Sequence, residues 1–317
     1  MSEQHTEPSA GHIGERVLVV GEALIDVVVH PDGSREGVAG GSPANVALGL
    51  ARLGARPDFL SHIGQDADGE HILTRLRASG VRVLPETVGA ARTPTAEVTL
   101  DSGGHASYRF EVSWELPETA NIDLGAALHV GSYSAFMEPG AARVSELALR
   151  AHAFGVPVSF DPNIRPALIG ARADVRARFE RIARVSTVVK LSDEDARWLF
   201  PGETLEATIA RVSALGPALV AVTRGGDGAL LASRAETVPV EPPAVNVVDT
   251  IGAGDSFMAA LVAESLARYG MSATELAGLG AGGLTALGEV CVAAAAITVG
   301  RRGAELPTRA ELRAGAE

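Results

Sequence analysis

VVDTIGAGDSFMAALVAESLA, residues 247–267, is the stretch that indicates both the fold and the chemistry of this chain. We expect a strand to run into the turn formed by Gly252, Ala253 and Gly254, and a helix to begin near Asp255. Glycines at the start of a helix let successive backbone N–H groups face an anion, and the helix dipole adds a partial positive charge there. The stretch therefore predicts a binding site for a phosphoryl group.

Asp255 is unusual in such a site, because its charge would repel a phosphate unless it acts as a general base on a nearby hydroxyl. An aspartate N-cap behind a tight glycine turn is the alternative, and it stays open. A dinucleotide-binding fingerprint is disfavoured, because the position of its third glycine is occupied by Phe257. A P-loop is excluded, because the single lysine, Lys190, is far from these glycines.

Short runs rich in β-branched residues recur between helical patterns along the chain. They are VLVVG at 17–21, PDFLSHIG at 57–64, VPVSFDP at 156–162, STVVKL at 186–191 and ALVAVTRGG at 218–226. Helices are expected from Ser42, from Gly69, over 141–154 and from Asp255, and Ser42 before Pro43 is typical of an N-cap. Strands that alternate with helices predict an α/β fold whose mainly parallel sheet is covered on both faces.

Two segments break this alternation, IDVVVHPDG at 25–33 and TAEVTLDSGGHASYRFEVS at 95–113. Apolar and polar residues alternate in both around glycine turns, which predicts antiparallel hairpins. In a parallel α/β protein, such strands would form a small separate sheet. That sheet could be a flap over the ligand edge or a plain surface hairpin, and the pattern alone leaves both open.

Composition limits the class of ligand. The chain has 317 residues, of which 46% are hydrophobic, so it can bury a large core, and its net charge of −12 gives no general attraction for nucleic acid or anionic membranes. We expect a small-molecule ligand. The single cysteine, Cys291, cannot form an internal disulfide, which favours a reducing cytoplasm.

The N-terminus and one late helix bear on localisation. Residues 1–15 are polar and lack an apolar stretch, so we expect a disordered lead-in and no signal peptide. The most membrane-like window, 281–300, contains Glu289 and several glycines, and we expect a buried helix there.

DTIGAGDSF at 249–257 closely resembles the C-terminal signature of the ribokinase-like (PfkB-type) carbohydrate kinases, and VAGGSPANVALGLARLG at 38–54 resembles their N-terminal glycine-rich signature. The likeness extends from about Val17 to Pro307, through VTRGGDGAL at 222–230 and AAAAITVGRRGAELP at 293–307. It implies a Rossmann-like αβα sandwich with a small β-sheet lid, ATP with Mg²⁺, and transfer of the γ-phosphate to a sugar alcohol. The kinase domain would span 16–317, with lid strands over about 26–38 and 94–113.

The resemblance assigns roles to individual residues. It makes Asp255 the catalytic base, with the backbone of Gly252, Ala253 and Gly254 as an anion hole. The sugar-binding positions that match are Asp26, Gly40, Gly41 and Asn45. The carboxylate of Asp26 and the amide of Asn45 can pair with vicinal hydroxyls, and the glycines permit close approach. Capping roles for Asp26 and Asn45 stay open. The nucleotide-side positions that match are Lys190, Ser192, Thr223, Gly225, Gly226, Gly228 and Val292.

Some positions depart from the family pattern. Where many members carry an Asn-x-x-Glu element near Mg²⁺, this chain has Ser192, Asp193, Glu194 and Asp195, and Val292 stands where some relatives place an asparagine beside adenine. A monovalent cation, K⁺, is implied beside the anion hole. Its ligands would be Asp249 and the carbonyls of Ile251, Thr298, Arg301 and Gly303.

The substrate is suggested by a further likeness. GEALIDVV, FDPNIRPAL and KLSDEDARWLFPG look most like the fructokinase branch, which implies conversion of fructose to fructose 6-phosphate. Arg109 and Arg165 are candidate substrate contacts or surface ion pairs, and a guanidinium also suits a carboxylate, so a 2-keto-3-deoxygluconate kinase or a ribokinase remains an alternative. A non-catalytic nucleotide- or sugar-binding protein is the alternative of another class. The lid strands could also pair between two subunits in a homodimer.

Overall fold

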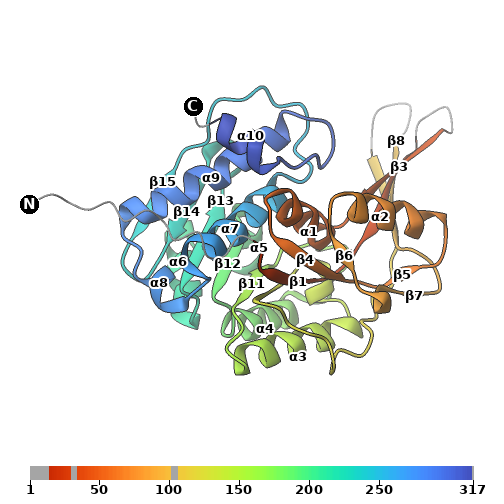
Figure 1. Cartoon of the computed structure of the whole chain (residues 1–317), viewed down its shortest axis with the longest axis horizontal. Helices are drawn as coiled ribbons and strands as arrows, with labels where there is room; N and C mark the ends of the chain where they lie inside the picture. Colours follow the sequence, from red (N-terminus) through yellow and green to blue (C-terminus); the bar gives the residue numbers. More distant parts are fainter. Residues whose placement is uncertain (1–13, 30–33, 101–105, 316–317) are drawn as a thin grey trace, which may run out of the picture.

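The computed structural model describes residues 14–29, 34–100 and 106–315, which form an α/β sandwich with a smaller sheet to one side (Figure 1). This confirms the expected fold class. The lead-in expected over 1–15 lies outside the described residues apart from Gly14 and Glu15.

The central sheet has nine strands in the described part of the chain. Their order is β15 (Thr237–Val240), β14 (Ala229–Ala232), β13 (Leu219–Thr223), β12 (Val188–Ser192), β11 (Val158–Asp161), β10 (Ala127–Gly131), β1 (Arg16–Val20), β4 (Arg56–Leu60) and β6 (Arg82–Val83). All neighbours are parallel except the β13–β14 and β14–β15 pairs at one edge. The five β-branched runs each contain a strand of this structure, and the sheet also includes β6, β10, β14 and β15, which were not among the expected strands.

Helices cover both faces of this sheet and give the molecule two hydrophobic cores (Figure 1). One face carries α1 (Ser42–Arg52), α2 (Ala67–Ala78), α7 (Ala253–Tyr269), α8 (Ala273–Ala277), α9 (Ala281–Val299) and α10 (Arg309–Ala314). The other carries α3 (Gly140–Ala153), α4 (Arg172–Ala183), α5 (Asp193–Leu199) and α6 (Leu205–Leu215). The parallel strands thus direct their carboxyl ends to one shared edge, where α/β proteins bind ligands.

Two local expectations around the glycine signatures are wrong. Ser42 is not an N-cap, because Gly41 with φ of 102° caps α1 and Ser42 is already helical. No strand runs directly into the turn at Gly252, since residues 241–250 have no regular structure and include Pro242 and Pro243, which lack backbone donors. Gly252 itself, with φ of 78°, caps α7, and a Cβ there would lie 2.7 Å from the Cβ of Ala304.

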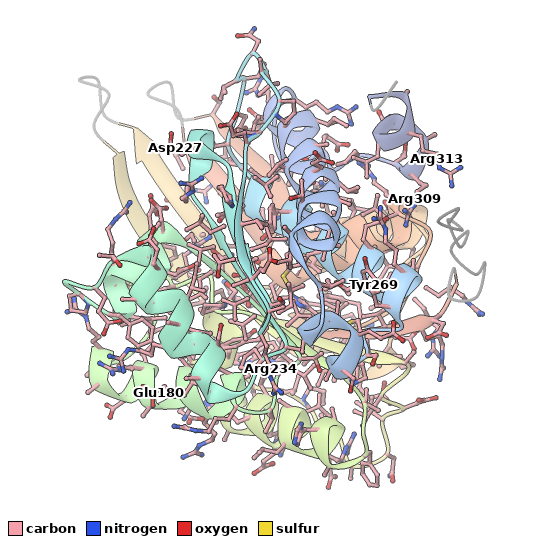
Figure 2. The ribbon with its side chains drawn as sticks, turned by 90° about the vertical axis from the view of Figure 1, so that its left-hand side faces the viewer. Glu180, Asp227, Arg234, Tyr269, Arg309 and Arg313 are labelled. Carbon is pink, nitrogen blue, oxygen red and sulfur yellow. The ribbon has the colours of Figure 1, made fainter. Side chains whose placement is uncertain are left out.

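The smaller sheet, here called the lid, has the strand order β3 (Arg35–Gly40), β2 (Leu24–Val29), β8 (Thr95–Leu100) and β9 (Ala106–Glu111). Both expected hairpins are antiparallel, and a parallel pairing of β2 with β8 joins them. The lid projects beside α2 at one end of the molecule (Figure 1). Figure 2 labels Asp227, which follows β13, above Arg234, which follows β14.

Five short elements complete the described fold. β5 (Ile63–Gly64) pairs with β7 (Val88–Ala90), and the short helices are η1 (Pro85–Thr87), η2 (Tyr133–Ala135) and η3 (Gly225–Asp227). Helix α9, in the window expected to be buried, packs Leu284, Leu287 and Cys291 into the core and leaves other positions partly open to solvent. Its length and composition would suffice to cross a membrane, a test that core helices also pass.

Candidate active site

Asp255 lies at the centre of the site, in the first turn of α7. Its carboxylate is 7% exposed and accepts two hydrogen bonds from α1, from Ser42 Oγ at 2.6 Å and from Asn45 Nδ2 at 2.8 Å. The cap of α7 is Gly252 and makes no side-chain cap bond, so Asp255 is not an N-cap. The two signatures, which are more than 200 residues apart, thus meet at one carboxylate.

The glycine turn presents free backbone donors beside that carboxylate. The first N–H groups of a helix have no intrahelical acceptor, which leaves the amides of Gly254 and Asp255 available to an anion. The amide of Ala253 differs, because it donates to the Thr250 carbonyl at 3.3 Å. An oxyanion could displace that long bond.

Asp26 faces the same region from the lid. It lies on β2 opposite Val38 of β3, and its carboxylate contacts Gly40 so closely that a Cβ at Gly40 would collide with it. A Cβ at Gly41 would lie 2.7 Å from the Glu22 carbonyl. Glycine at both positions is therefore required for the chain to turn from the lid into α1.

The pKa of Asp26 depends on two other predicted site residues, Arg165 and Asp255. Solvent reaches Asp26, but the atoms packed around it disfavour its charged form and raise its pKa to about 6. The Arg165 guanidinium opposes this rise, and the negative charge of Asp255 adds to it. Arg165 and Asp255 thus both lie within electrostatic reach of Asp26.

Arg109 is not part of this group. Asp26 pairs with Ala96, whereas Arg109 pairs with Glu97, which follows Ala96 on β8. Because neighbouring residues of a strand point to opposite faces, Arg109 lies on the other face of the lid from Asp26. Its side chain is 72% exposed and ion-paired with Glu111, which is the surface role that the sequence left open.

The predicted nucleotide loop follows β13. Thr223 ends the strand, and its hydroxyl donates to the Leu191 carbonyl at 3.4 Å. A Cβ at Gly225 or Gly226 would meet only open space, which leaves room for a ligand. At Gly228, with φ of 78°, a Cβ would collide with the Val240 carbonyl, so packing against β15 already requires this glycine.

Most polar side chains of the segment 192–195, which replaces the Asn-x-x-Glu element, are already bonded to other groups of the protein. Ser192 and Asp195 form a capping box on α5, with bonds of 2.9 Å and 2.8 Å. The second oxygen of Asp195 accepts from the Ile164 amide at 2.7 Å, and Asp193 pairs with Arg197. Of the three acidic residues in this segment, Glu194 is the exposed one. Among the described residues, no three His, Cys, Asp or Glu gather as a metal cluster.

Val292 and Lys190 lie differently from what the sequence suggested. Val292 of α9 is 5% exposed and packs in the core, so it is not open to a ligand in this structure. Lys190, described above as far from the glycines, is close to them in space, and a Cβ at Gly254 would be 3.1 Å from its Nζ. Sequence distance was misleading because β12 passes directly beneath the start of α7.

The predicted cation ligands gather where two loops meet. Asp249 accepts from the Ile251 amide at 3.0 Å and from the Gly303 amide at 2.9 Å, which keeps its pKa below the usual value. The Thr298 carbonyl accepts from the Arg301 amide at 3.0 Å. A carboxylate and backbone carbonyls are oxygen donors of the kind that bind a monovalent cation, and here they come from two neighbouring loops.

Two further groups were missed by the sequence reasoning. Arg75 of α2 donates to the Ala39 carbonyl and, at 2.7 Å, to the Ala304 carbonyl, so it joins the base of the lid to the loop behind Gly252. A long arginine on a helix gives no sequence signal for such a bridge.

The second missed group is the buried carboxylate of Glu22, just before β2. Burial raises the pKa of Glu22 to about 7, and its carboxylate accepts from the Ser134 amide at 3.3 Å. The buried Tyr133 hydroxyl, whose pKa is raised by burial and then by Glu22 and Asp26, has no hydrogen-bond partner in the described structure. The motif GEALID contains Glu22, but its letters do not show that the side chain turns inward.

Comparison with known proteins gives a consistent result. Residues 15–311 match the model of the pfkB family carbohydrate kinases. A fructokinase of Salmonella typhimurium is 35% identical over 267 residues, which cover 81% of this chain and 86% of that protein.

Solved structures are similar over nearly the whole chain. A fructokinase from Xylella fastidiosa with bound ATP has a TM-score of 0.82 at 27% identity, covering 95% of this chain and 99% of the other. A double mutant of the fructokinase from Vibrio cholerae O395, bound to fructose, ADP and a potassium ion, has a TM-score of 0.82 at 27% identity, covering 96% of this chain and 99% of the other.

Proposed function

The chain belongs to the pfkB family of carbohydrate kinases, and on that premise we propose that it transfers the γ-phosphoryl group of ATP to the 6-hydroxyl of fructose. The bond between the γ-phosphorus and the bridging oxygen of ATP breaks, and a bond from the sugar oxygen to that phosphorus forms. The hydroxyl proton passes to Asp255, and the products are ADP and fructose 6-phosphate.

The observation that carries the proposal is the position of Asp255. Ser42 and Asn45 hold its carboxylate at the glycine turn, next to amides that can bind the transferred phosphoryl group. Asp26 and Arg165 lie on the lid side, where the sugar hydroxyls would bind. A base between a hydroxyl site and an anion site is the arrangement that phosphoryl transfer to an alcohol requires.

ATP would lie along the loop after β13, over the open positions Gly225 and Gly226. Mg²⁺, which neutralises phosphate charge, would arrive on the nucleotide, since proteins hold this ion through one or two carboxylates and the substrate phosphates. Glu194 is available as such a carboxylate, whereas Asp195 and Ser192 are engaged in the cap of α5.

A panel of acceptors tests the substrate. ADP formation should be fastest with fructose when fructose, ribose, 2-keto-3-deoxygluconate, adenosine and no acceptor are compared at equal concentration. The exposed Arg165 is the observation that favours a carboxylate-bearing sugar acid as second candidate. A higher kcat/KM for 2-keto-3-deoxygluconate would replace the first proposal, and no acceptor-dependent rate at all would favour the non-catalytic alternative.

Potassium should raise the rate. A cation held by Asp249 and the carbonyls of the two loops would order the turn that presents the Gly254 amide, because both loops pack against it. We expect several-fold higher kcat in K⁺ than in tetramethylammonium at equal ionic strength, and no such difference in Asp249→Ala. Equal rates of the wild-type protein in both salts would contradict the site.

The lid is proposed to close over the sugar and to pair with a second copy of the chain. Val38 is 42% exposed and lies on β3, an edge strand of the lid, on the face that also carries Asp26. Exposed sheet edges are commonly covered by a partner. We expect a dimeric mass in solution scattering and a more compact lid with fructose. A monomeric mass across the working concentration range would remove the dimer.

We place the enzyme in the cytoplasm, where ATP and sugar are available.

A further inference from the structure

Arg75 is a half-buried arginine near the end of α2 that bonds to two segments far apart in the sequence. Its guanidinium donates to the Ala39 carbonyl in β3 and, at 2.7 Å, to the Ala304 carbonyl in the loop after α9. Burial lowers its pKa, and the Glu305 carboxylate, 3.8 Å away, opposes this shift. A guanidinium keeps its charge in proteins and presents its donors in a fixed fork, so it can hold both carbonyls at once. We call these two bonds the Arg75 bridge.

One end of the Arg75 bridge lies where the lid runs into α1. Ala39 is followed by Gly40, which contacts the Asp26 carboxylate. Gly41 then caps α1. A small cavity of about 10 Å³ lies between Ala39 and Gly40 on one side and α1 and α2 on the other. Atoms that line a void lack packing partners on that side, so the bond from Arg75 contributes to the position of the strand that carries the sugar-binding glycines.

The other end of the bridge lies behind the glycine turn. A Cβ at Gly252 would be 2.7 Å from the Cβ of Ala304, so the two residues are in close contact. Gly252 caps α7, and the first free amides of this helix form the predicted anion site. Gly303, which precedes Ala304, donates to Asp249 of the predicted cation site at 2.9 Å. Donors to a transferring phosphoryl group must lie within about 2.7–3.1 Å of its oxygens, so a small shift of Ala304 would change the fit.

A second contact joins the same loop to β3 in the described structure, but it lies on the surface. Arg302 is 3.7 Å from Glu36, and its side chain is 84% exposed. Exposed ion pairs contribute little, because water and salt screen them and both side chains lose freedom. The half-buried Arg75 bridge is thus the stronger of these two connections between the lid and the loop.

A purely local role for Arg75 is the alternative. Arg75 and Arg77 both lie in the last turn of α2, where a positive charge interacts favourably with the helix dipole. Arg77 is exposed. It shares the charge and the helix position of Arg75 but not the bridge, which makes it the matched control.

We propose that Arg75 is a positioning residue, which transmits the binding of sugar at the lid to the turn that receives the phosphoryl group. This rests on the proposed kinase function. Fructose bound at Asp26 holds β3 in place, so the Ala39 carbonyl fixes the guanidinium. The guanidinium in turn fixes Ala304 behind Gly252, which orders the amides of the turn when a sugar is present. Transfer to the sugar is thereby favoured over transfer to water.

Hydrogen exchange with fructose alone tests the Arg75 bridge without turnover. In the wild-type protein, fructose should slow amide exchange both in β3, residues 35–40, and in the loop 301–305. Arg75→Met removes both bonds but keeps an apolar stem, so fructose should still slow exchange in β3 but not in the loop. Arg77→Met should behave as the wild-type protein does. Arg75→Gln, which is shorter than arginine and has one donor nitrogen, should repeat the result and covers the case that the methionine variant does not fold.

The outcomes separate the bridge from the proposed function. Equal slowing of the loop 301–305 in Arg75→Met and in the wild-type protein would overturn the inference. So would a wild-type loop that fructose does not slow although β3 is slowed. If fructose slows β3 in none of these proteins, the sugar site itself is wrong, and the inference falls with the proposed function.

Steady-state rates give a second readout that a merely structural role would not change. Arg75→Met should lower kcat by about 2- to 30-fold, the range expected for a residue that couples two sites. It should also raise the ratio of ATP hydrolysis to sugar phosphorylation, because the turn is no longer ordered by sugar. Loss of folded protein would lower both rates equally and leave this ratio unchanged. An unchanged ratio in Arg75→Met, the result expected for Arg77→Met, would show that Arg75 only stabilises the fold.

Discussion

Asp255→Asn is expected to lower kcat by about 10²- to 10⁴-fold, the usual contribution of a positioned general base. Asparagine has nearly the same shape but cannot accept the sugar proton, and its amide can no longer accept from both Ser42 and Asn45. The KM for fructose should change far less than kcat, because the residue acts mainly in the transition state. Steady-state rates, with ADP affinity measured by calorimetry, give both quantities.

Asp193→Asn is the matched control for this substitution. It makes the same chemical change on α5, where Asp193 forms a surface ion pair with Arg197, and surface pairs contribute little. The control should keep wild-type kcat and thermal stability. Near-wild-type turnover of Asp255→Asn would refute its role as base, whatever the control does.

Asp26→Ala should raise the KM for fructose by about 10- to 100-fold, because a hydrogen bond to a charged acceptor contributes about 1.5–3 kcal/mol. ATP binding should be unchanged, since Asp26 lies on the lid strand β2. Phosphoryl transfer at saturating sugar should fall less than binding does. If only the KM for ATP moved, the assignment of Asp26 to the sugar would be wrong.

The same residue gives the pH dependence a definite sign. The pKa of Asp26 is raised to about 6, so the carboxylate that accepts sugar hydroxyls is lost as pH falls through that value. The kcat/KM for fructose should therefore rise from pH 5 to pH 7. The free energy of unfolding depends on pH with the opposite sign. Between the ordinary pKa of an aspartate and about 6, the folded protein binds a proton on Asp26 that the unfolded chain does not bind. The stability that this proton contributes is lost as pH rises through this window. Asp26→Ala should remove its share of the pH dependence of stability near pH 6. The shares of Glu22 and Asp161, whose pKa values burial raises to about 7 and about 6, should remain.

The sequence was sufficient for the parts of the fold that local rules control. Alternating strand and helix patterns predicted the parallel sheet, and alternating polarity predicted both lid hairpins. The glycines before Asp255 predicted a helix start whose backbone N–H groups are available to an anion. The strand expected before Gly252 was wrong because two prolines in the segment 241–250 outweigh its apolar residues.

Contacts between distant segments could not be predicted in this way. Nothing near Ser42 shows that its hydroxyl meets a carboxylate 213 residues later, and nothing near Lys190 shows that its strand passes under Gly254. The position of Arg109 was accessible in principle, because strand parity separates it from Asp26 once the register of β2, β8 and β9 is known. That register is set by tertiary pairing, which no single sequence states.

Transfer of the phosphoryl group to the 6-hydroxyl of fructose can be observed directly by ³¹P NMR of the reaction of the protein with MgATP and [6-¹³C]fructose. We expect a new phosphate monoester signal coupled to the labelled carbon, appearing together with ADP and absent with Asp255→Asn over the same time. A monoester signal without coupling to C6, or ATP loss that yields only inorganic phosphate, would contradict it.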